Sequence, residues 1–349
     1  MVKADAYGLG VREVVTALRH LPSPADPWAF GVAAVTEGER LRADGWAGRV
    51  LVFSPVAPGE YLRAAEAELT LCLSSVEAVA AWAKAASSVG RSLPFHLEID
   101  TGMGRAGLPW ATAAEWGPRV AAAAAGHLVW EGIYTHFHSA DEPDLGPTDE
   151  QWQRFQSALR VLPSIDPRPL LHVANSGAIL RRGGFGCDLA RPGIFLYGGR
   201  AGPGVEPAPV VSVRARIVLI REVEAGSSVG YGATSRAPGP QRWGTLSIGY
   251  GDGLPRALAR GGGEVLVRGR RVPIIGRISM DMTTVDLSEV SDVRVGDVAT
   301  LIGEDQGTVI YVDEVADRCG TISYEILTGL TQRLPRVYVE GEHGNVVQG

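Results

Sequence analysis

The amino-acid sequence predicts an α/β fold in which an N-terminal (β/α)8 barrel precedes a C-terminal domain built mostly of antiparallel strands. Over about the first 200 residues, short apolar runs alternate with segments rich in Ala, Leu, Arg and Glu, which is the pattern of repeated βα units. After Tyr197 most helical segments disappear, and strand-like runs are separated by Gly, Asp and Pro turns. We therefore expect a barrel over residues 1–205 and a β-rich domain over residues 206–349.

Eight apolar runs are the expected strands of a closed, TIM-type parallel barrel, whose functional residues would lie in the loops that follow the strands. They cover residues 1–4, 28–33, 49–54, 69–74, 94–100, 128–138, 170–175 and 188–198. In the second domain we expect strands within residues 210–223, 244–250, 263–276, 282–287, 297–303 and 336–340, and one short helix over residues 312–320.

The composition is that of an ordinary globular protein, with 45% apolar residues among 349 and a net charge of −6. The arginines are scattered among acidic residues, which argues against a nucleic-acid partner. The three cysteines form no CxxC pair, so we expect neither a disulfide framework nor a zinc knuckle. Neither a signal-peptide pattern nor an apolar run of membrane-spanning length is visible, so we expect a cytoplasmic protein without a membrane partner.

Lysine is rare in this chain, and its two occurrences have very different surroundings. Lys84 lies in the Ala-rich stretch AVAAWAKAASS, where a solvent-exposed helix face is expected. Lys3 lies at the end of the first expected strand, four residues before Tyr7 and ahead of the glycines that lead into a helix. A barrel would keep a catalytic amine at this kind of position.

The segment HLEIDTGMGRAG places several charged residues at the end of the fifth expected strand. The strand period of two puts His96, Glu98 and Asp100 on one face, and the glycines then lead to Arg105. Carboxylates beside a loop arginine suggest an anchored guanidinium that grips a substrate carboxylate. A purely structural ion network in the barrel core is the alternative.

The segment THFH presents His136 and His138 on one face of the next strand. Such a pair could bind a metal, but barrel metallohydrolases normally carry it at the first strand and add further histidines and an aspartate. Only His172 offers itself as an additional histidine. We therefore expect hydrogen-bonding histidines and no metal.

Two further segments suggest a phosphate site after strands seven and eight. Asn175, Ser176 and Gly177 give the start signal of a short helix, and Arg191 precedes a Pro-Gly pair and Ile194. A hydroxyl, backbone N–H groups and a helix N-terminus at this point of a barrel form a phosphate cradle. A plain helix cap is the simpler interpretation of Ser176.

The second domain carries three tyrosines in or beside its expected strands. Tyr231 lies in VGYGATS, Tyr250 in IGYGDGLPR and Tyr324 in ISYEI, and the segment IIGRISMDM adds Met280 and Asp281. Taken singly, tyrosines in strands are more often core residues than catalytic ones. Their neighbouring glycines hint at close backbone approach.

Taken together, these segments resemble the alanine racemases, the fold-type III enzymes that use pyridoxal 5′-phosphate, and at least six motifs match in the same order over nearly the whole chain. The resemblance implies Lys3 in MVKADAYG as the Schiff-base lysine and Arg105 in DTGMGRAG as the anchor of the substrate carboxylate. It also implies that Arg191 faces the pyridine nitrogen and is hydrogen-bonded to His136. The implied phosphate contacts are Tyr7, Ser176, Gly193, Ile194 and Tyr324.

The resemblance further implies a two-base reaction on L- and D-alanine in a head-to-tail homodimer. Lys3 would act on the D face of a planar intermediate and Tyr231 on the L face. Tyr231 and Met280 would reach the site from the other subunit, with Tyr250 and Asp281 nearby. Permanently cationic, Arg191 would leave the pyridine nitrogen unprotonated and so disfavour transamination. The product D-alanine would serve bacterial peptidoglycan synthesis.

Two features depart from the family pattern. Glu98 stands where many family members carry a carbamylated lysine, and we expect it to supply the same negative charge and to pair with Arg105. The family usually has a longer segment before the lysine motif, including a full first strand, whereas here the first expected strand is reduced to a few residues.

Other functions remain open at the level of the sequence. A serine or broad-spectrum amino-acid racemase would use the same residues, although Tyr231, Tyr250 and Met280 would leave room for little more than a methyl group. A non-catalytic barrel that binds pyridoxal phosphate would explain Lys3 but would lack the second domain. A decarboxylase of the same fold would lack the SMD segment, and a metallohydrolase that uses His136 and its neighbour is the most distant alternative.

Overall fold

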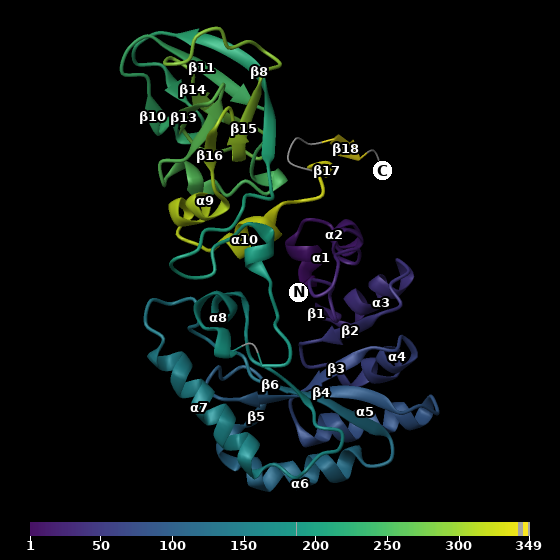
Figure 1. Cartoon of the computed structure of the whole chain (residues 1–349). Coiled ribbons are helices and arrows are strands. Elements are labelled where there is room, and N and C mark those ends of the chain that lie inside the picture. Colours follow the sequence, from purple (N-terminus) through teal and green to yellow (C-terminus); the bar gives the residue numbers. More distant parts are fainter. Residues whose placement is uncertain (186, 341–344, 348–349) are drawn as a thin grey trace. The chain divides into compact units, whose positions relative to one another are not determined.

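The computed structural model describes residues 1–185, 187–340 and 345–347 of the chain, which fall into two compact units (Figure 1). The barrel unit comprises residues 1–6, 10–193 and 201–205. The β unit comprises residues 7–9, 194–200 and 206–349. Within the described residues, every helix is too short or too polar to cross a membrane.

The barrel unit is built on one curled parallel sheet with the strand order β1-β2-β3-β4-β6-β7, in which β5 pairs with β4. The strands are β1 (Ala29–Val32), β2 (Arg49–Val52), β3 (Thr70–Leu73), β4 (Leu93–Asp100), β5 (Leu108–Pro109), β6 (Leu128–Tyr134) and β7 (Leu170–His172). Six of the eight expected barrel strands are therefore confirmed. Together with the second unit they confirm the predicted fold class.

Two expected strands do not form, although all their residues are described. Residues 3–7 form α1 (Lys3–Tyr7), and Ala4, Asp5, Ala6 and Tyr7 have φ between 53° and 57°, which is left-handed helical backbone. Residues 188–198 contain no strand and include the 3-10 turn η4 (Ile194–Tyr197). Pro192 has no N–H to donate to a strand ladder, which disfavours a central strand there.

Helices connect the strands, as expected for βα units. They are α2 (Val11–Leu18), α3 (Val35–Ala43), α4 (Tyr61–Glu66), α5 (Val76–Ser88), α6 (Ala113–Ala124), α7 (Gly146–Val161) and α8 (Ser176–Arg181), with the 3-10 turns η1 (Pro58–Glu60), η2 (Trp110–Thr112) and η3 (Gly183–Phe185). Helices α3 to α7 lie around the outside of the sheet (Figure 1).

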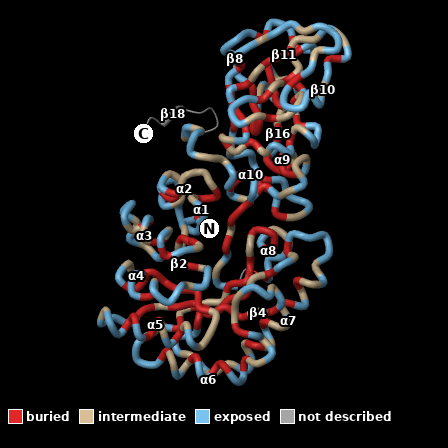
Figure 2. Tube along the Cα trace, turned by 180° about the vertical axis from the view of Figure 1, so that it is seen from behind, coloured by how far each residue is buried: buried red, intermediate tan, exposed pale blue. Residues whose placement is uncertain are grey.

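The core of the barrel unit follows its strands, where the buried residues concentrate (Figure 2). All four residues of β3 are buried, as expected for a parallel strand covered on both faces. Inside the sheet, Leu51, Cys72 and Tyr134 form a buried cluster against which Trp28 and Phe53 pack.

The β unit is built on an antiparallel sheet with the order β12-β13-β14-β11-β8-β15-β16, and an additional pairing of β12 with β15 closes it on itself. Its strands are β8 (Val213–Val223), β11 (Gln241–Leu246), β12 (Glu264–Val267), β13 (Arg270–Ile275), β14 (Thr283–Asp286), β15 (Val298–Asp305) and β16 (Thr308–Ile310). Two small sheets pair β9 (Ser228–Val229) with β10 (Ser235–Arg236), and β17 (Tyr338–Glu340) with β18 (Asn345–Val347). Each segment expected to hold a strand contains one or part of one.

The β unit also contains α9 (Val312–Cys319) and α10 (Ser323–Gly329), and the turns η5 (Tyr231–Ala233), η6 (Tyr250–Asp252) and η7 (Arg256–Ala259). Helix α9 confirms the one helix expected in this part of the chain. Tyr250 and Tyr324, however, lie in a turn and a helix rather than in strands. The segment ISYEI around Tyr324 carries residues that favour strands, but Ile322 is the N-cap of α10, so Ser323 and Tyr324 begin the helix.

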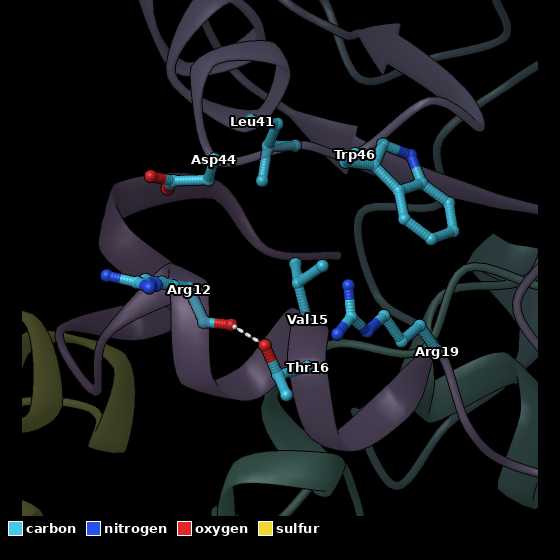
Figure 3. Close-up of a pocket in the computed structure, with 7 residues that line it drawn as sticks. All are labelled: Arg12, Val15, Thr16, Arg19, Leu41, Asp44 and Trp46. Atoms are coloured by element: carbon cyan, nitrogen blue, oxygen red, sulfur yellow. Dashed lines mark hydrogen bonds between the residues drawn. The ribbon is translucent and has the colours of Figure 1, made fainter. Parts of the chain in front are cut away.

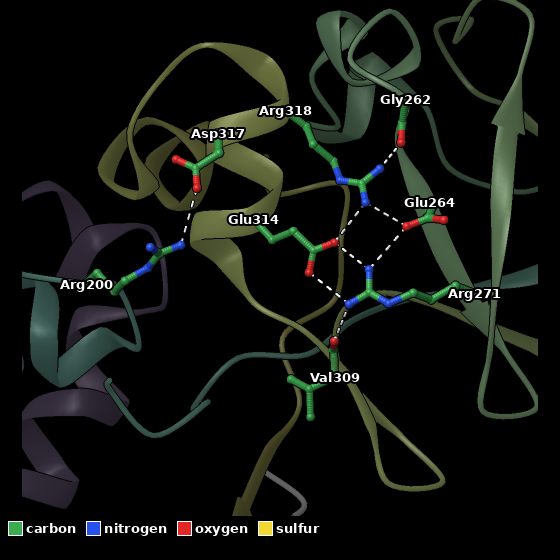
Figure 4. Close-up of polar contacts among 8 residues, drawn as sticks. All are labelled: Arg200, Gly262, Glu264, Arg271, Val309, Glu314, Asp317 and Arg318. Atoms are coloured by element: carbon green, nitrogen blue, oxygen red, sulfur yellow. Dashed lines mark hydrogen bonds and ion pairs between the residues drawn. The ribbon is translucent and has the colours of Figure 1, made fainter. Parts of the chain in front are cut away.

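An ion network ties α9 to the sheet of the β unit (Figure 4). Arg318 Nη2 lies 2.6 Å from Glu264 Oε2 and 3.1 Å from Glu314 Oε1, and Arg271 Nη2 lies 2.9 Å from Glu314 Oε2. Two arginines thus share two carboxylates, so the pairs hold one another in place. The network joins elements of the unit and contains none of the expected site residues.

Candidate active site

Lys3 begins the left-handed turn α1, which two carboxylates hold in place. Left-handed backbone costs an L-residue about 1–2 kcal/mol, so four such residues in a row need external support. Glu37 Oε1 accepts a hydrogen bond from the N–H of Ala4 at 2.6 Å, and Asp5 Oδ1 accepts one from the N–H of Val11 at 3.0 Å. These bonds fix the backbone that carries Lys3.

Three cationic side chains act on the imidazole of His136. Burial, followed by the charges of Arg191, Arg105 and Lys3, lowers the pKa of His136 to about 3, so the imidazole is neutral at neutral pH. Burial and the charge of Arg105 also lower the pKa of Lys3, while Glu37 opposes that change. The structure therefore brings together four residues that the sequence singled out, and the Lys3 amine loses its proton more readily than a free lysine does.

Glu98 is buried inside the barrel unit, with its carboxylate held by hydroxyl groups. Ser74 Oγ donates to Glu98 Oε2 at 3.2 Å. Burial raises the pKa of Glu98, and this rise is opposed by hydrogen bonds from Tyr134 and Ser74 and then by the charges of Arg105 and Arg191. Among the ion pairs between described residues, none joins Glu98 to Arg105 directly. The expected pairing is thus replaced by an electrostatic interaction at longer range.

Two side chains that the sequence grouped with the site serve their own loops instead. Asp100 Oδ1 accepts hydrogen bonds from the N–H groups of Gly102 at 2.9 Å and Gly104 at 3.1 Å, which shapes the loop leading to Arg105. His138 is exposed, and its Nδ1 lies 2.6 Å from Ser139 Oγ. No group of three or more potential metal ligands occurs in the described part of the chain.

Arg191 is buried and donates mainly to backbone carbonyls. Its Nη2 donates to the oxygens of Thr135 at 2.9 Å and Val173 at 3.1 Å, and its Nη1 donates to the oxygen of His172 at 2.7 Å. Nη2 also lies 3.5 Å from His136 Nδ1. Burial lowers the pKa of Arg191, but a guanidinium stays cationic in proteins, so Arg191 is a fixed donor.

The short helix α8 begins beside the loop that follows Arg191. Asn175 is its N-cap and accepts a hydrogen bond from the N–H of Ala178 at 3.0 Å, so Ser176 is the first helical residue rather than the cap. The buried Ser176 Oγ accepts a hydrogen bond from the N–H of Gly193 at 2.8 Å. The structure therefore brings together these two expected phosphate contacts of the barrel unit.

The remaining expected phosphate contacts lie in the β unit, where aromatic rings cluster. Tyr7 stacks on Tyr197 with ring centroids 4.5 Å apart, and its ring lies 5.8 Å from that of Tyr324. Burial and the nearby Tyr324 raise the pKa of Tyr7, so its phenol stays protonated and able to donate. Ile194 is fully buried. A Cβ added at Gly199 would lie only 2.6 Å from Ile194 Cγ1, so the backbone of Gly199 packs directly against this side chain.

Two turns of the β unit hold Tyr250 and Met280 side by side. The N–H of Tyr250 donates to the oxygen of Ser279 at 3.0 Å, and the next N–H along the chain donates to the oxygen of Met280 at 2.8 Å. Beside them, Asp281 Oδ1 accepts a hydrogen bond from Arg333 Nη2 at 2.8 Å. These three expected site residues therefore share one surface of the unit.

Tyr231 lies at the tip between β9 and β10 and is 68% exposed. Tyr250 and Met280 are also exposed, at 42% and 51%. A Cβ at Gly232 would lie 3.2 Å from Arg277 Nη1, which places a guanidinium against the turn that carries Tyr231. Arg277 was not among the expected site residues, because its place beside this turn comes from the fold and not from a motif.

A separate pocket of the barrel unit contains none of the expected site residues (Figure 3). It is lined by Arg12, Val15, Thr16, Arg19, Leu41, Asp44 and Trp46. One side is the exposed face of α2, where Thr16 Oγ1 donates to the oxygen of Arg12 at 2.8 Å. We assign no role in the proposed reaction to this pocket.

Comparisons with known proteins agree over both units. The family models for the alanine racemase N-terminal and C-terminal domains match residues 1–201 and 210–338. Alanine racemases of Halothermothrix orenii and Geobacter sulfurreducens are 37% and 38% identical, with 97% of this chain and 89% of each relative covered. A crystal structure of alanine racemase from Bartonella henselae with covalently bound pyridoxal phosphate gives a TM-score of 0.86 at 30% identity, covering 97% of this chain and 91% of that chain. The chain therefore belongs to the alanine racemase family.

Proposed function

We propose that Lys3 and Tyr231 are the two proton-transferring groups of an alanine racemase that uses pyridoxal 5′-phosphate. Interconversion of L- and D-alanine with this cofactor is the activity of the family, and both domain models match the chain. The observation that carries the assignment of Lys3 is its setting. It is one of only two lysines in the sequence, and burial and Arg105 lower the pKa of its amine.

The residues of the barrel unit fit an anionic cofactor. Lys3, Arg105 and Arg191 all lower the pKa of the same imidazole, so the region carries an excess of positive charge that a phosphate or carboxylate would neutralise. Bound pyridoxal phosphate supplies an electron sink that acidifies the α-proton of an amino acid. In the proposed assignment Lys3 and Arg191 hold its ring, and Tyr7, Ser176, Gly193, Ile194 and Tyr324 hold its phosphate.

In the proposed reaction, three residues act directly on the substrate. Arg105 binds the substrate carboxylate, so that only the α-hydrogen meets a base. The amine of Lys3 removes or returns the proton at Cα on the D face, and the phenolic oxygen of Tyr231 does so on the L face. The lowered pKa of Lys3 supports this role, because a base must be available in its deprotonated form.

We further propose a homodimer in which Tyr231 and Met280 act in the partner's site. Both side chains are more than half exposed in the β unit, which suits residues that another subunit would cover. Alanine is the proposed substrate, because Met280 and the two exposed tyrosines would restrict the space beside Cα. The proposed role is supply of D-alanine for peptidoglycan in the cytoplasm.

The test combines an activity assay with chemical mapping. The enzyme supplied with pyridoxal phosphate is incubated with L-alanine or L-serine, and chiral chromatography follows the D-enantiomer. Borohydride reduction then fixes the cofactor to its lysine, and peptide mapping locates it. We expect D-alanine to form faster than D-serine, label on Lys3, and loss of activity in Lys3→Ala but not in Lys84→Ala, whose residue is exposed on α5. Racemisation by Lys3→Ala, or label on Lys84, would refute the assignment.

A further inference from the structure

A chain of polar side chains leads from Arg191 through the interior of the barrel unit to its surface. Arg191 Nη1 lies 2.8 Å from His172 Nδ1, and His172 Nε2 lies 2.7 Å from His96 Nδ1. At the far end, His96 Nε2 lies 3.4 Å from Glu131 Oε2. Arg49 Nε, 3.3 Å from Glu131 Oε1, holds the carboxylate from outside.

The chemistry of the two ends fixes which nitrogen carries each proton. A guanidinium can only donate, so His172 Nδ1 must accept and neutral His172 carries its proton on Nε2. That proton points at His96 Nδ1, so His96 carries its own proton on Nε2, facing Glu131. An ionised carboxylate can only accept, so every group from Arg191 to Glu131 has one consistent role.

The protonation states agree with this direction. Burial lowers the pKa of both His172 and His96, so the imidazoles are neutral at neutral pH. Burial raises the pKa of Glu131, but the hydrogen bond from His96 and the charge and hydrogen bond of Arg49 outweigh it and bring the pKa below its usual value. The carboxylate is therefore ionised and available as the terminal acceptor.

The sheet is shaped around the two imidazoles. Gly132 pairs with His96 across β4 and β6, and a Cβ at Gly132 would lie 2.2 Å from His96 Nδ1. Only glycine leaves room for the ring at that point. Tyr134 stacks on His172 with centroids 4.8 Å apart and planes 9° apart. Both rings are thus held by packing as well as by hydrogen bonds.

We propose that Glu131 is a positioning residue for Arg191, which it orients through the fixed tautomers of His96 and His172. This inference rests on the proposed function, in which Arg191 faces the cofactor's pyridine nitrogen. Among the described side chains no carboxylate lies within ion-pair distance of Arg191, so none competes for its donors. Placed at the far end of two imidazoles, the Glu131 charge polarises the chain and makes His172 Nδ1 a stronger acceptor.

The first test reads the tautomers directly. The holoenzyme is labelled with 15N in its histidine side chains, and long-range proton–nitrogen correlation spectra report which nitrogen of each ring is protonated. His96→Gln and His172→Gln identify the two resonance sets among seven histidines. Protons on Nε2 of both residues are expected. A proton on Nδ1 of either residue, or a doubly protonated ring at neutral pH, would overturn the proposal.

The second test removes the carboxylate. Glu131→Gln keeps an acceptor oxygen without its charge, and Glu131→Leu removes the acceptor. Around metal-bound histidines, loss of the outer carboxylate that orients the ring typically costs 10- to 100-fold in activity. We therefore expect kcat to fall about tenfold in Glu131→Gln and further in Glu131→Leu, with the KM for alanine changed less than about twofold, because Arg105 is the proposed substrate anchor. The exposed Glu115→Gln on α6 is the matched control.

A third measurement separates this proposal from the proposed function. In Glu131→Gln the 15N resonances of His172 and of the Arg191 guanidinium are expected to shift, whereas in Glu115→Gln they stay in place. This result does not require racemisation. A wild-type enzyme that cannot racemise alanine would refute the proposed function alone, whereas unshifted His172 and Arg191 resonances, or wild-type kcat in both Glu131 variants, would refute the role of Glu131.

Discussion

A lysine amine can serve as a base at neutral pH only if its surroundings favour loss of its proton. Lys3 meets this condition because its surroundings are partly desolvated and because Arg105 lies within electrostatic range. Burial and the charges of Arg191, Arg105 and Lys3 keep His136 neutral. At the scale of single residues, the site therefore depends on cations placed close together, with Glu98 as the nearby buried acid.

Glu98→Gln tests the role of that buried charge. The amide oxygen can still accept from Ser74, but the negative charge that acts with Arg105 is lost. We expect the KM for alanine to rise about fivefold with kcat little changed, because an interaction of about 1 kcal/mol with Arg105, the proposed substrate anchor, is removed. Steady-state kinetics measure the effect beside Glu115→Gln. An unchanged KM would show that Arg105 does not need Glu98.

The buried histidines predict how stability depends on pH. His96, His136 and His172 have pKa values below the unfolded value of about 6.5, and that of His136 is about 3. The unfolded chain therefore binds protons that the folded chain does not, so the stability present above about pH 6.5 is lost as the pH falls. Between about pH 6.5 and its pKa in the folded protein, each histidine lowers the free energy of unfolding by about 1.4 kcal/mol for every pH unit of acidification. Urea unfolding between pH 7.5 and 5 measures the slope, and a flat profile would contradict the prediction.

At the scale of elements, the left-handed turn α1 is the least expected feature of the fold. Ala4 to Tyr7 contain no glycine, so residue types give no sign of positive φ. Two hydrogen bonds hold this conformation. Glu37, on α3, accepts one from the N–H of Ala4, and Asp5, within the turn itself, accepts one from the N–H of Val11. A short apolar start followed by a charged residue favours a strand instead, which is why the sequence-based expectation was wrong here.

Ala4→Gly tests whether the turn stores conformational strain. Glycine adopts left-handed backbone without a Cβ clash, and this gain exceeds its larger entropy in the unfolded chain. We expect the free energy of unfolding to rise by about 0.5 kcal/mol. Ala80→Gly in the exposed middle of α5 is the control and should lower it by about 1 kcal/mol. Equal destabilisation by both substitutions would show that Ala4 is unstrained.

Strands with two buried faces were the easiest elements to predict. Residues 70–73 and 93–100 carry apolar or β-branched side chains at most positions, and both form strands of the parallel sheet. Residues 188–198 are apolar too, but Pro192 cannot donate in a ladder and the chain turns at Ile194 instead. Tyr324 belongs to α10, whose N-cap is Ile322, although its segment ISYEI favours a strand.

At the scale of the whole molecule, the residues of the proposed site that the sequence singles out are those carried by family motifs. Lys3, Arg105 and Arg191 each sit in a recognisable segment. Glu131 does not, since its relation to Arg191 depends on the register of β4, β6 and β7 and on two intervening rings. Sequence spacing alone cannot supply that register.

Mixing two inactive variants tests the proposed shared site. In a mixed dimer of Lys3→Ala and Tyr231→Phe, one site would combine both substitutions and the other would contain native Lys3 and native Tyr231. After random reassociation of equal amounts, half of the dimers are mixed, so about a quarter of wild-type activity should return. A mixture as inactive as its components would indicate that each site uses residues of one chain.

The two-base assignment is tested most directly by exchange of the Cα hydrogen of each alanine enantiomer in heavy water. The wild-type enzyme should incorporate deuterium from both enantiomers. Tyr231→Phe should still exchange D-alanine through Lys3 but lose exchange of L-alanine, because the base on that face is gone. Exchange of both enantiomers by Tyr231→Phe at the wild-type rate would contradict the account.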